Sequence, residues 1–149
     1  GAFGTRGIGY PVGPTTEKIR SILKLDVCQQ AALVGAGRLG AAIAAYPGFS
    51  MFGFDITAVF DNDPAKVGRT IGKNQVEDIR RIDTLKDRGV RLAILAVPGE
   101  SAQACAESLI DAGIKGFLNL SPCYLDVPKR VKVVTIDIAM ELGILPYYI

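Results

Sequence analysis

Three glycines at a fixed spacing follow one apolar run, and an acidic residue ends the next. The first run is residues 31–34, and the glycines are Gly35, Gly37 and Gly40. Gly35 would allow a tight turn, Gly37 would leave room for phosphate oxygens, and Gly40 would let a helix close on its strand. Asp61 lies about 20 residues further on, where an acid can accept hydrogen bonds from a ribose. Together these residues predict a dinucleotide site with the pyrophosphate at a helix N-terminus.

The other residues of this loop, Ala36, Arg38 and Leu39, are also expected to contact the cofactor. The Arg38 guanidinium could pair with a phosphate or with a carboxylate across an interface, and it could equally face solvent. The charge of Asp61 would repel the additional phosphate of NADP, so NAD(H) is the expected cofactor. The alternative for Asp61 is a turn-forming role in the Asp-Asn-Asp-Pro run that it begins.

Two later apolar runs end where ligands of open α/β sheets bind. Val97 and Pro98 end the first, and their backbone is expected to contact the cofactor. Asn119 and Ser121 end the second, where either side chain could reach the nicotinamide. Turn chemistry explains Ser121 before Pro122 equally well.

These residues need strands and helices to position them. Strands are expected at residues 30–34, 55–61, 75–79, 91–97, 116–120 and 131–135, and helices from Thr15 to about residue 25, at 38–46, before Gly113 and at 136–142. The alternation predicts a doubly wound parallel α/β sheet, a Rossmann fold, in the order 3-2-1-4-5 with a possible sixth strand. Residues 1–26 are expected to form a linker and an N-terminal helix, and residues 27–149 the Rossmann domain.

Composition narrows the functional class. The chain has 149 residues, of which 49% are hydrophobic, which suits one ordinary domain. Its net charge is +2, and its basic residues are scattered along the chain, so the sequence predicts no basic patch for binding nucleic acid. Without a membrane span or signal peptide, a cytoplasmic location is expected. Cys28, Cys105 and Cys123 suggest neither a disulfide framework nor a zinc site, and without histidine the usual general acid–base group is missing.

Seven motifs occur in one order along nearly the whole chain. They are FGTRGIGY at 3–10, GAGRLG at 35–40, YPGF at 46–49, FDNDPAKVG at 60–68, AVP at 96–98, AGIKG at 112–116 and DIAMEL at 137–142. This ordered set closely resembles the Rex family of redox-sensing transcriptional repressors. It is far more specific than a dinucleotide fingerprint.

The resemblance implies a function. Rex proteins are homodimers in which an N-terminal winged-helix domain binds operator DNA and a C-terminal Rossmann domain binds NAD(H). This chain resembles only the second part, and its start at Gly1 without methionine is expected to mark a fragment. By resemblance, NADH would close the dimer and release DNA in the full-length protein, whereas this chain alone would sense NADH without binding the operator.

The resemblance also implies roles for residues near the C-terminus. The terminal helix would be exchanged between subunits and lie near the partner's nicotinamide. Asp137 and Tyr46 match a carboxylate–tyrosine pair formed across subunits, and Arg38 matches a position close to the pyrophosphate and to that pair. Ile138 matches a position that is aromatic in some members, so an aliphatic contact with the nicotinamide is expected. Residues 147–149 match the apolar end of the exchanged helix.

Three other functions remain open from the sequence. An NAD-dependent oxidoreductase could use the same loop, although the chain lacks histidine and a separate substrate domain. A CoA-binding domain like those of acyl-CoA ligases shares the fold, although Asp61 would then face the 3′-phosphate of CoA. A purely structural dimerisation module would bind neither ligand.

Overall fold

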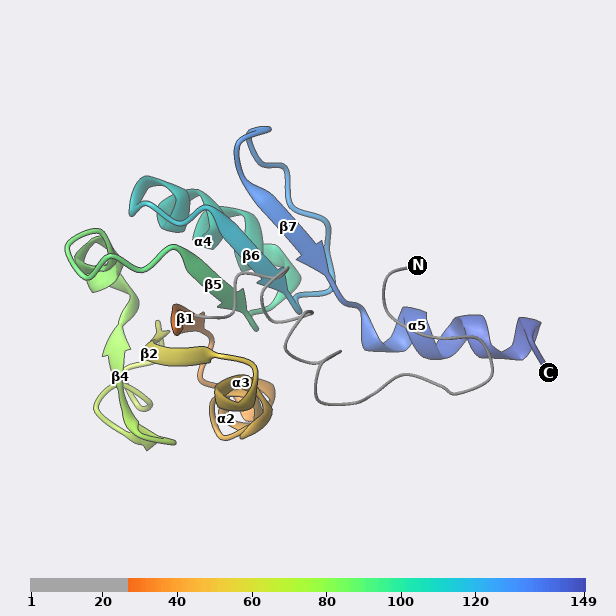
Figure 1. Ribbon diagram of the computed structural model, residues 1–149, viewed down its shortest axis with the longest axis horizontal. Coiled ribbons are helices and arrows are strands. Elements are labelled where there is room, and N and C mark those ends of the chain that lie inside the picture. The colour runs from red at the N-terminus through yellow and green to blue at the C-terminus, as the bar shows by residue number, and fades with distance from the viewer. Residues whose placement is uncertain (1–26) are drawn as a thin grey trace, which may run out of the picture. The chain divides into compact units, whose positions relative to one another are not determined.

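The structure is a computed structural model that describes residues 27–149 (Figure 1). The linker and helix expected over residues 1–26 lie outside the described residues. The chain divides into a small unit that includes residues 47–55 and a large unit of residues 30–46 and 56–149. The large unit carries all of the predicted site residues.

The main element is a seven-stranded sheet in the order β3-β4-β2-β1-β5-β6-β7. Its strands are β1 (Gln29–Val34), β2 (Phe54–Asp61), β3 (Thr70–Ile71), β4 (Asn74–Asp78), β5 (Leu92–Leu95), β6 (Gly116–Asn119) and β7 (Lys132–Thr135). The pairs β2·β4, β1·β5, β5·β6 and β6·β7 are parallel, and β3 pairs antiparallel with β4. The predicted α/β sheet and its strand order are therefore confirmed, including the sixth strand, and β3 is an addition at one edge.

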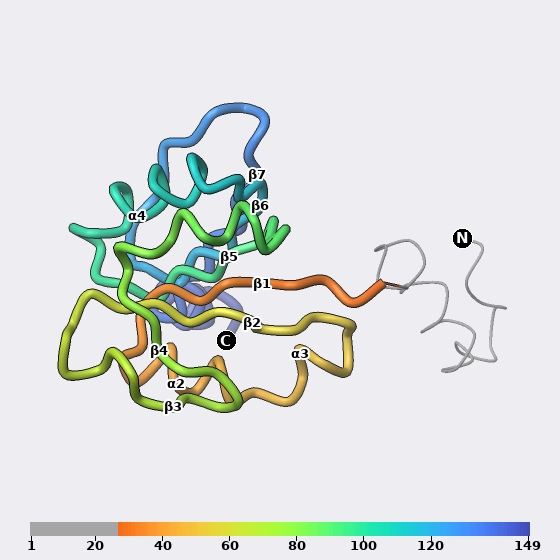
Figure 2. The backbone as a smooth tube through the Cα atoms, turned by 90° about the vertical axis from the view of Figure 1, so that its left-hand side faces the viewer, coloured from red at the N-terminus to blue at the C-terminus, as the bar shows by residue number. Residues whose placement is uncertain are grey.

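The central strands are apolar because both of their faces are covered. Figure 2 shows β1 between β2 and β5, in agreement with the strand order. In β1, residues 31–34 are all buried, and the core also includes Phe60 of β2 and Leu95 of β5. Near-continuous apolar runs of this kind are typical of parallel strands packed on both faces.

Four α-helices and two short 3-10 helices connect or follow the strands. They are α2 (Arg38–Ala44), α3 (Gly48–Met51), α4 (Gly99–Asp111), α5 (Ile138–Ile144), η1 (Ile79–Leu85) and η2 (Leu145–Tyr147) within the described residues. The apolar face of α4 buries Ala102, Ala106 and Leu109, and α4 packs against β5. Gly113 follows α4 at a φ of +96°, as expected for a left-handed residue after a helix. None of the described helices is both long and apolar enough to cross a bilayer.

Two helix boundaries differ from the sequence-based prediction. The helix expected over 38–46 ends at Ala44, shortly before Pro47, because the residue before a proline disfavours the helical conformation. The helix expected over 136–142 begins at Ile138 and ends at Ile144. Its start is set by Asp137, whose carboxylate caps the helix.

Strand ends also differ from the sequence-based prediction. The strand predicted for 75–79 ends at Asp78, because the side chain of Asp78 accepts a hydrogen bond from the Arg80 N–H and starts η1. The strand predicted for 91–97 covers only Leu92–Leu95. Short elements such as η1, α3 and β3 carry too little periodicity to be predicted from sequence.

The C-terminal segment is apolar but has no buried residue. Figure 1 shows α5 following β7 without covering either face of the sheet. Neither α5 nor η2 contains a buried residue. The exposed apolar side chains of this segment are Ile138, Met140, Leu142, Ile144, Leu145, Tyr147, Tyr148 and Ile149. We call these residues the tail surface.

Candidate functional site

The glycine loop joins the end of β1 to the start of α2. Gly35 has a φ of +103°, and a Cβ atom there would collide with the carbonyl oxygen of Ala96. A Cβ atom on Gly40 would collide with the carbonyl oxygen of Gly35. By contrast, no heavy atom lies within 4 Å of the position a Cβ atom would take on Gly37. Gly35 and Gly40 are therefore needed by the fold itself, whereas Gly37 borders open space.

Asp61 ends β2 beside this loop and is almost fully buried. Its Oδ2 accepts a hydrogen bond of 2.7 Å from the Ala36 N–H, and its Oδ1 accepts one of 2.8 Å from the Asp63 N–H. The ammonium of Lys66 lies 3.2 Å from Oδ2. The acid at the end of the second predicted strand is thus tied to the glycine loop.

The same contacts determine the ionisation of Asp61. Burial raises the pKa of this carboxyl, but the backbone donors of Asp63 and Ala36 and the nearby Lys66 ammonium lower it by more. The net pKa therefore lies below its ordinary value of 3.8. Asp61 is a carboxylate at neutral pH, as required of a hydrogen-bond acceptor for ribose hydroxyls.

Lys66 is a residue that the sequence reasoning missed. It was part of a recognised motif, but no role followed from its position. The turn after Asp61 brings Lys66 back, with its N–H donating to the Asp63 carbonyl at 2.9 Å. Its ammonium then contacts Asp61 and lies 3.9 Å from Asp63 Oδ2. The turn-forming run of acids and proline was the signal that could have located it.

The polar residues after β6 form a buried network. Asn119 and Ser121 are both fully buried. Asn119 donates from Nδ2 to the Cys123 carbonyl at 2.7 Å and to Thr135 Oγ1 at 3.3 Å, and its Oδ1 accepts from the Ser121 N–H at 3.1 Å. Ser121 Oγ in turn accepts from the Val97 N–H at 3.3 Å. These side chains link the ends of β5, β6 and β7.

The predicted residues lie in three places. The glycine loop, Asp61 and the residues after β5 and β6 gather at the carboxyl edge of the parallel strands, because such strands all end on one side. Arg38, Leu39 and Tyr46 are exposed on or just after α2, and Pro98 is exposed at the start of α4. Asp137 and Ile138 follow β7, where Asp137 Oδ1 accepts from the Ala139 and Met140 N–H groups at 3.0 and 3.1 Å. The capping role of Asp137 was not predicted.

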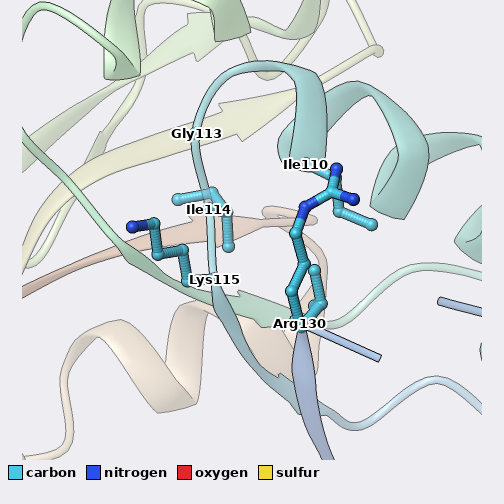
Figure 3. Close-up of a pocket in the computed structure, with 6 residues that line it drawn as sticks. Ile110, Gly113, Ile114, Lys115 and Arg130 are labelled. Carbon is cyan, nitrogen blue, oxygen red and sulfur yellow. The ribbon is translucent and has the colours of Figure 1, made fainter. Parts of the chain in front are cut away.

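A cavity of about 310 Å³ lies elsewhere in the large unit. It is lined by Ile110, Gly113, Ile114, Lys115, Arg130 and Val131. Figure 3 shows the Ile114 side chain between those of Lys115 and Arg130. These residues directly precede β6 and β7, so the cavity is at the opposite edge of the sheet from the glycine loop. It contains none of the predicted site residues.

The described residues contain neither a cluster of metal-ligating side chains nor a disulfide. Over residues 27–149 no group of three or more histidine, cysteine or acidic residues is arranged to hold a metal ion. The three cysteines, all within this range, are free thiols. Burial raises the pKa of Cys105, which favours its thiol form.

Comparisons with known proteins match this architecture. A family model described as a CoA binding domain matches residues 28–123, so this part of the chain is a member of that domain family. The chain is 41% identical over 150 residues to the redox-sensing transcriptional repressor Rex of Carboxydothermus hydrogenoformans, covering 100% of this chain and 72% of that protein. The chain belongs to the Rex family. Rex of Thermus thermophilus is also 41% identical, over 149 residues that cover 100% of this chain and 70% of the relative.

Solved Rex structures have the same fold. The Rex-family repressor RSP in complex with β-NAD⁺ and operator DNA has a TM-score of 0.88 at 33% identity, with 99% of this chain and 69% of that chain covered. RSP in complex with β-NADH has a TM-score of 0.87 at 32% identity, with 94% and 68% covered. The family and fold inferred from the ordered motifs are therefore confirmed. These Rex relatives are transcriptional repressors rather than enzymes.

Proposed function

We propose that this chain is the NADH/NAD⁺-sensing and dimerisation domain of a redox-responsive transcriptional repressor. The observation that carries the proposal is the hydrogen bond between Asp61 and Ala36, which joins the acid of β2 to a glycine loop that is open beside Gly37. Membership of the Rex family and the complexes of RSP with β-NAD⁺ and β-NADH support the same cofactor.

The adenosine half of the cofactor would bind at the glycine loop and Asp61. The open space beside Gly37 lets phosphate oxygens approach the backbone, and the exposed Arg38 guanidinium is free to pair with the pyrophosphate. The carboxylate of Asp61 has about four acceptor positions and uses three of them within the chain. The remaining position on Oδ1 would accept a ribose hydroxyl. Ala36, Leu39 and the two structural glycines, Gly35 and Gly40, complete this part of the proposed site.

The nicotinamide half would lie towards the ends of β5 and β6. Val97 and Pro98 would contact it through the backbone, and the buried network of Asn119 and Ser121 would fix the shape of that edge. Any direct contact by Asn119 requires it to exchange one of its present partners, because both ends of its amide are already hydrogen-bonded. The network therefore favours a positioning role for Asn119.

The sensing step would depend on a dimer with an exchanged C-terminal helix. The tail surface supports this arrangement, because a chain does not gain stability from eight large apolar side chains left in water. In the exchanged dimer, Asp137 would pair with Tyr46 of the other subunit, and Ile138 would contact the nicotinamide. A ligand shifts a conformational equilibrium only by binding its two states differently, so NADH must favour the closed dimer more than NAD⁺ does.

In the full-length repressor, closing of the dimer by NADH would release operator DNA. DNA would be bound through a winged-helix domain and not through this chain, whose 17 basic and 15 acidic residues are mixed. Action on operator DNA would place the protein in the cytoplasm.

The test is isothermal titration of the purified chain with NADH, NAD⁺ and CoA, with its mass measured by light scattering. A dimer that binds NADH at least tenfold more tightly than NAD⁺ is the expected result. The name of the matching domain model makes CoA the second candidate ligand. Tight binding of CoA with no response to NADH would overturn the proposal in favour of a CoA-binding domain, and equal affinities for NADH and NAD⁺ would overturn the sensing role.

A further inference from the structure

The starting observation is the ion pair at the adenosine end of the candidate site. Lys66 Nζ lies 3.2 Å from Asp61 Oδ2, and 34% of the Lys66 side chain is exposed, compared with 5% for Asp61. The ammonium therefore lies on the solvent side of a buried carboxylate. A ligand that reaches Asp61 from this side would therefore contact Lys66 as well.

The ammonium is held by two carboxylates. Its two nearest carboxylates are those of Asp61 and, at 3.9 Å, Asp63. Together the three residues carry one net negative charge, so they repel a phosphate less strongly than two unpaired carboxylates would. Rejection of a 2′-phosphate at this site would thus depend both on the charge of Asp61 and on the ion pair that Asp61 makes with Lys66.

We propose that Lys66 is a specificity-determining residue whose phosphate-binding capacity is masked by Asp61. While the pair is intact, the site favours a ribose with two free hydroxyls. Loss of the Asp61 carboxylate releases the ammonium, which then binds a 2′-phosphate, as carried by NADP(H). The inference rests on the proposed binding of NAD(H) and adds the residue that sets the choice between the two dinucleotides.

The charge argument gives opposite predictions for the two members of the pair. Asp61→Asn removes the repelling charge and frees the cation, so NADPH affinity rises. Lys66→Met leaves the carboxylate unpaired, so NADPH is excluded more strongly while NADH still finds its acceptor. In the double variant neither charge remains, and the gain seen in Asp61→Asn is lost.

The experiment measures dissociation constants for NADH and NADPH by titration, with NADPH also tested as a competitor of bound NADH. The proteins are the wild type, Asp61→Asn, Lys66→Met and the double variant. Lys86→Met is the matched control, since it removes one exposed positive charge that makes no ion pair in the described chain. We expect Asp61→Asn to bind NADPH at least tenfold more tightly than the double variant does.

The outcomes separate this inference from the proposed function. If the wild type binds NADH but Asp61→Asn and the double variant bind NADPH equally, the masking role of Lys66 is wrong and the NAD(H) site stands. If the wild type does not bind NADH, the proposed function itself is wrong, and this inference fails with it.

Asp61→Asn places an amide N–H opposite the Ala36 donor and can disturb the loop, so a second route to the same answer is needed. Asp61→Ser keeps a hydroxyl acceptor and is measured in parallel. Independently of any change at Asp61, Lys66→Met must increase the ratio of the NADPH to the NADH dissociation constant severalfold, and an unchanged or smaller ratio would overturn the inference.

Discussion

The N–H of Ala36 donates a hydrogen bond of 2.7 Å to Oδ2 of Asp61, which joins two segments 25 residues apart in the chain. The acid of the dinucleotide motif is therefore part of the loop structure itself. Because Oδ1 also accepts from Asp63, one carboxylate fixes the glycine loop and the turn after β2 together. Ionisation of Asp61 and the shape of the loop are consequently coupled.

Asp61 should make the stability of the domain depend on acid pH. Its pKa in the folded chain is below the ordinary value, so its contribution to the free energy of unfolding is complete above the unfolded pKa of about 3.9 and is lost as pH falls through the folded pKa. At pH 7, Asp61→Asn should lower the free energy of unfolding by about 1–3 kcal/mol. Urea denaturation between pH 7 and pH 3 should show this difference shrinking, and a constant difference would contradict the assignment.

Gly37 and Gly40 offer a matched pair of alanine variants. Gly40→Ala should be strongly destabilised, by about 1–3 kcal/mol or more, because its methyl group meets the Gly35 carbonyl. Gly37→Ala has open space and a φ of −76°, so its melting temperature should stay close to that of the wild type. Its NADH affinity should nevertheless fall at least tenfold, because the methyl group occupies the phosphate approach. Wild-type NADH binding by a folded Gly37→Ala would place the pyrophosphate elsewhere.

Two variants of Asp137 separate its role as the N-cap of α5 from the role of its negative charge. Asp137→Ala should lose the cap of α5, at a cost of about 1 kcal/mol in helix stability, whereas Asp137→Asn keeps it. Both variants lack the carboxylate proposed to meet Tyr46 of the other subunit. Titrations should therefore show a larger loss of affinity for NADH than for NAD⁺ in both. Equal losses for the two ligands would remove Asp137 from the coupling.

Substitution of Asn119 should lower the stability of the domain, because its side chain holds a hydrogen-bond network together. Asn119→Leu leaves the buried Ser121 N–H and the part-buried Cys123 carbonyl without their partner. We expect the free energy of unfolding to fall by about 1–3 kcal/mol in urea denaturation. Ser121→Ala, which removes only the longer bond of 3.3 Å from Val97, should cost less. The reverse order of the two variants would show that the network is not organised around Asn119.

The tail surface should hold the proposed dimer together. Leu142→Glu combined with Leu145→Glu puts two charges on it and should give a monomer by light scattering, since burial of those charges without partners is unfavourable. Glu141→Gln, in the same helix, is the control and should remain dimeric. A double variant with the mass of a dimer would contradict helix exchange through this surface.

The sequence predicted the parts of the fold that depend on local patterns. Apolar runs such as residues 31–34 indicated buried parallel strands. The spaced glycines indicated the turn after β1, because a side chain at Gly35 or Gly40 would collide with the backbone. The order of the strands followed from the rules of α/β connections. Short elements such as β3 were not predictable, because two residues carry no periodic signal.

The site was predicted less completely than the fold. Asp61 was predicted because it ends an apolar run and lies about 20 residues after the glycine motif. Its contact with Lys66 was not predicted, because that contact depends on how the intervening turn folds back. Asn119 was proposed as a ligand contact, but its burial and its three hydrogen bonds depend on β7 and on the loop after β6. Contacts of this kind arise from tertiary structure, so the spacing of residues in the sequence does not predict them.

Helix α5 has seven residues, and isolated helices shorter than about 12–15 residues are only marginally stable in water. Because no residue of α5 is buried among the described residues, association in the proposed dimer would supply folding free energy to this helix. In that dimer, helix formation and assembly would be a single equilibrium that obeys mass action. Dilution would melt the tail as it separates the subunits, so the response of the domain to NADH would depend on how much of the protein is present as well as on the cofactor ratio.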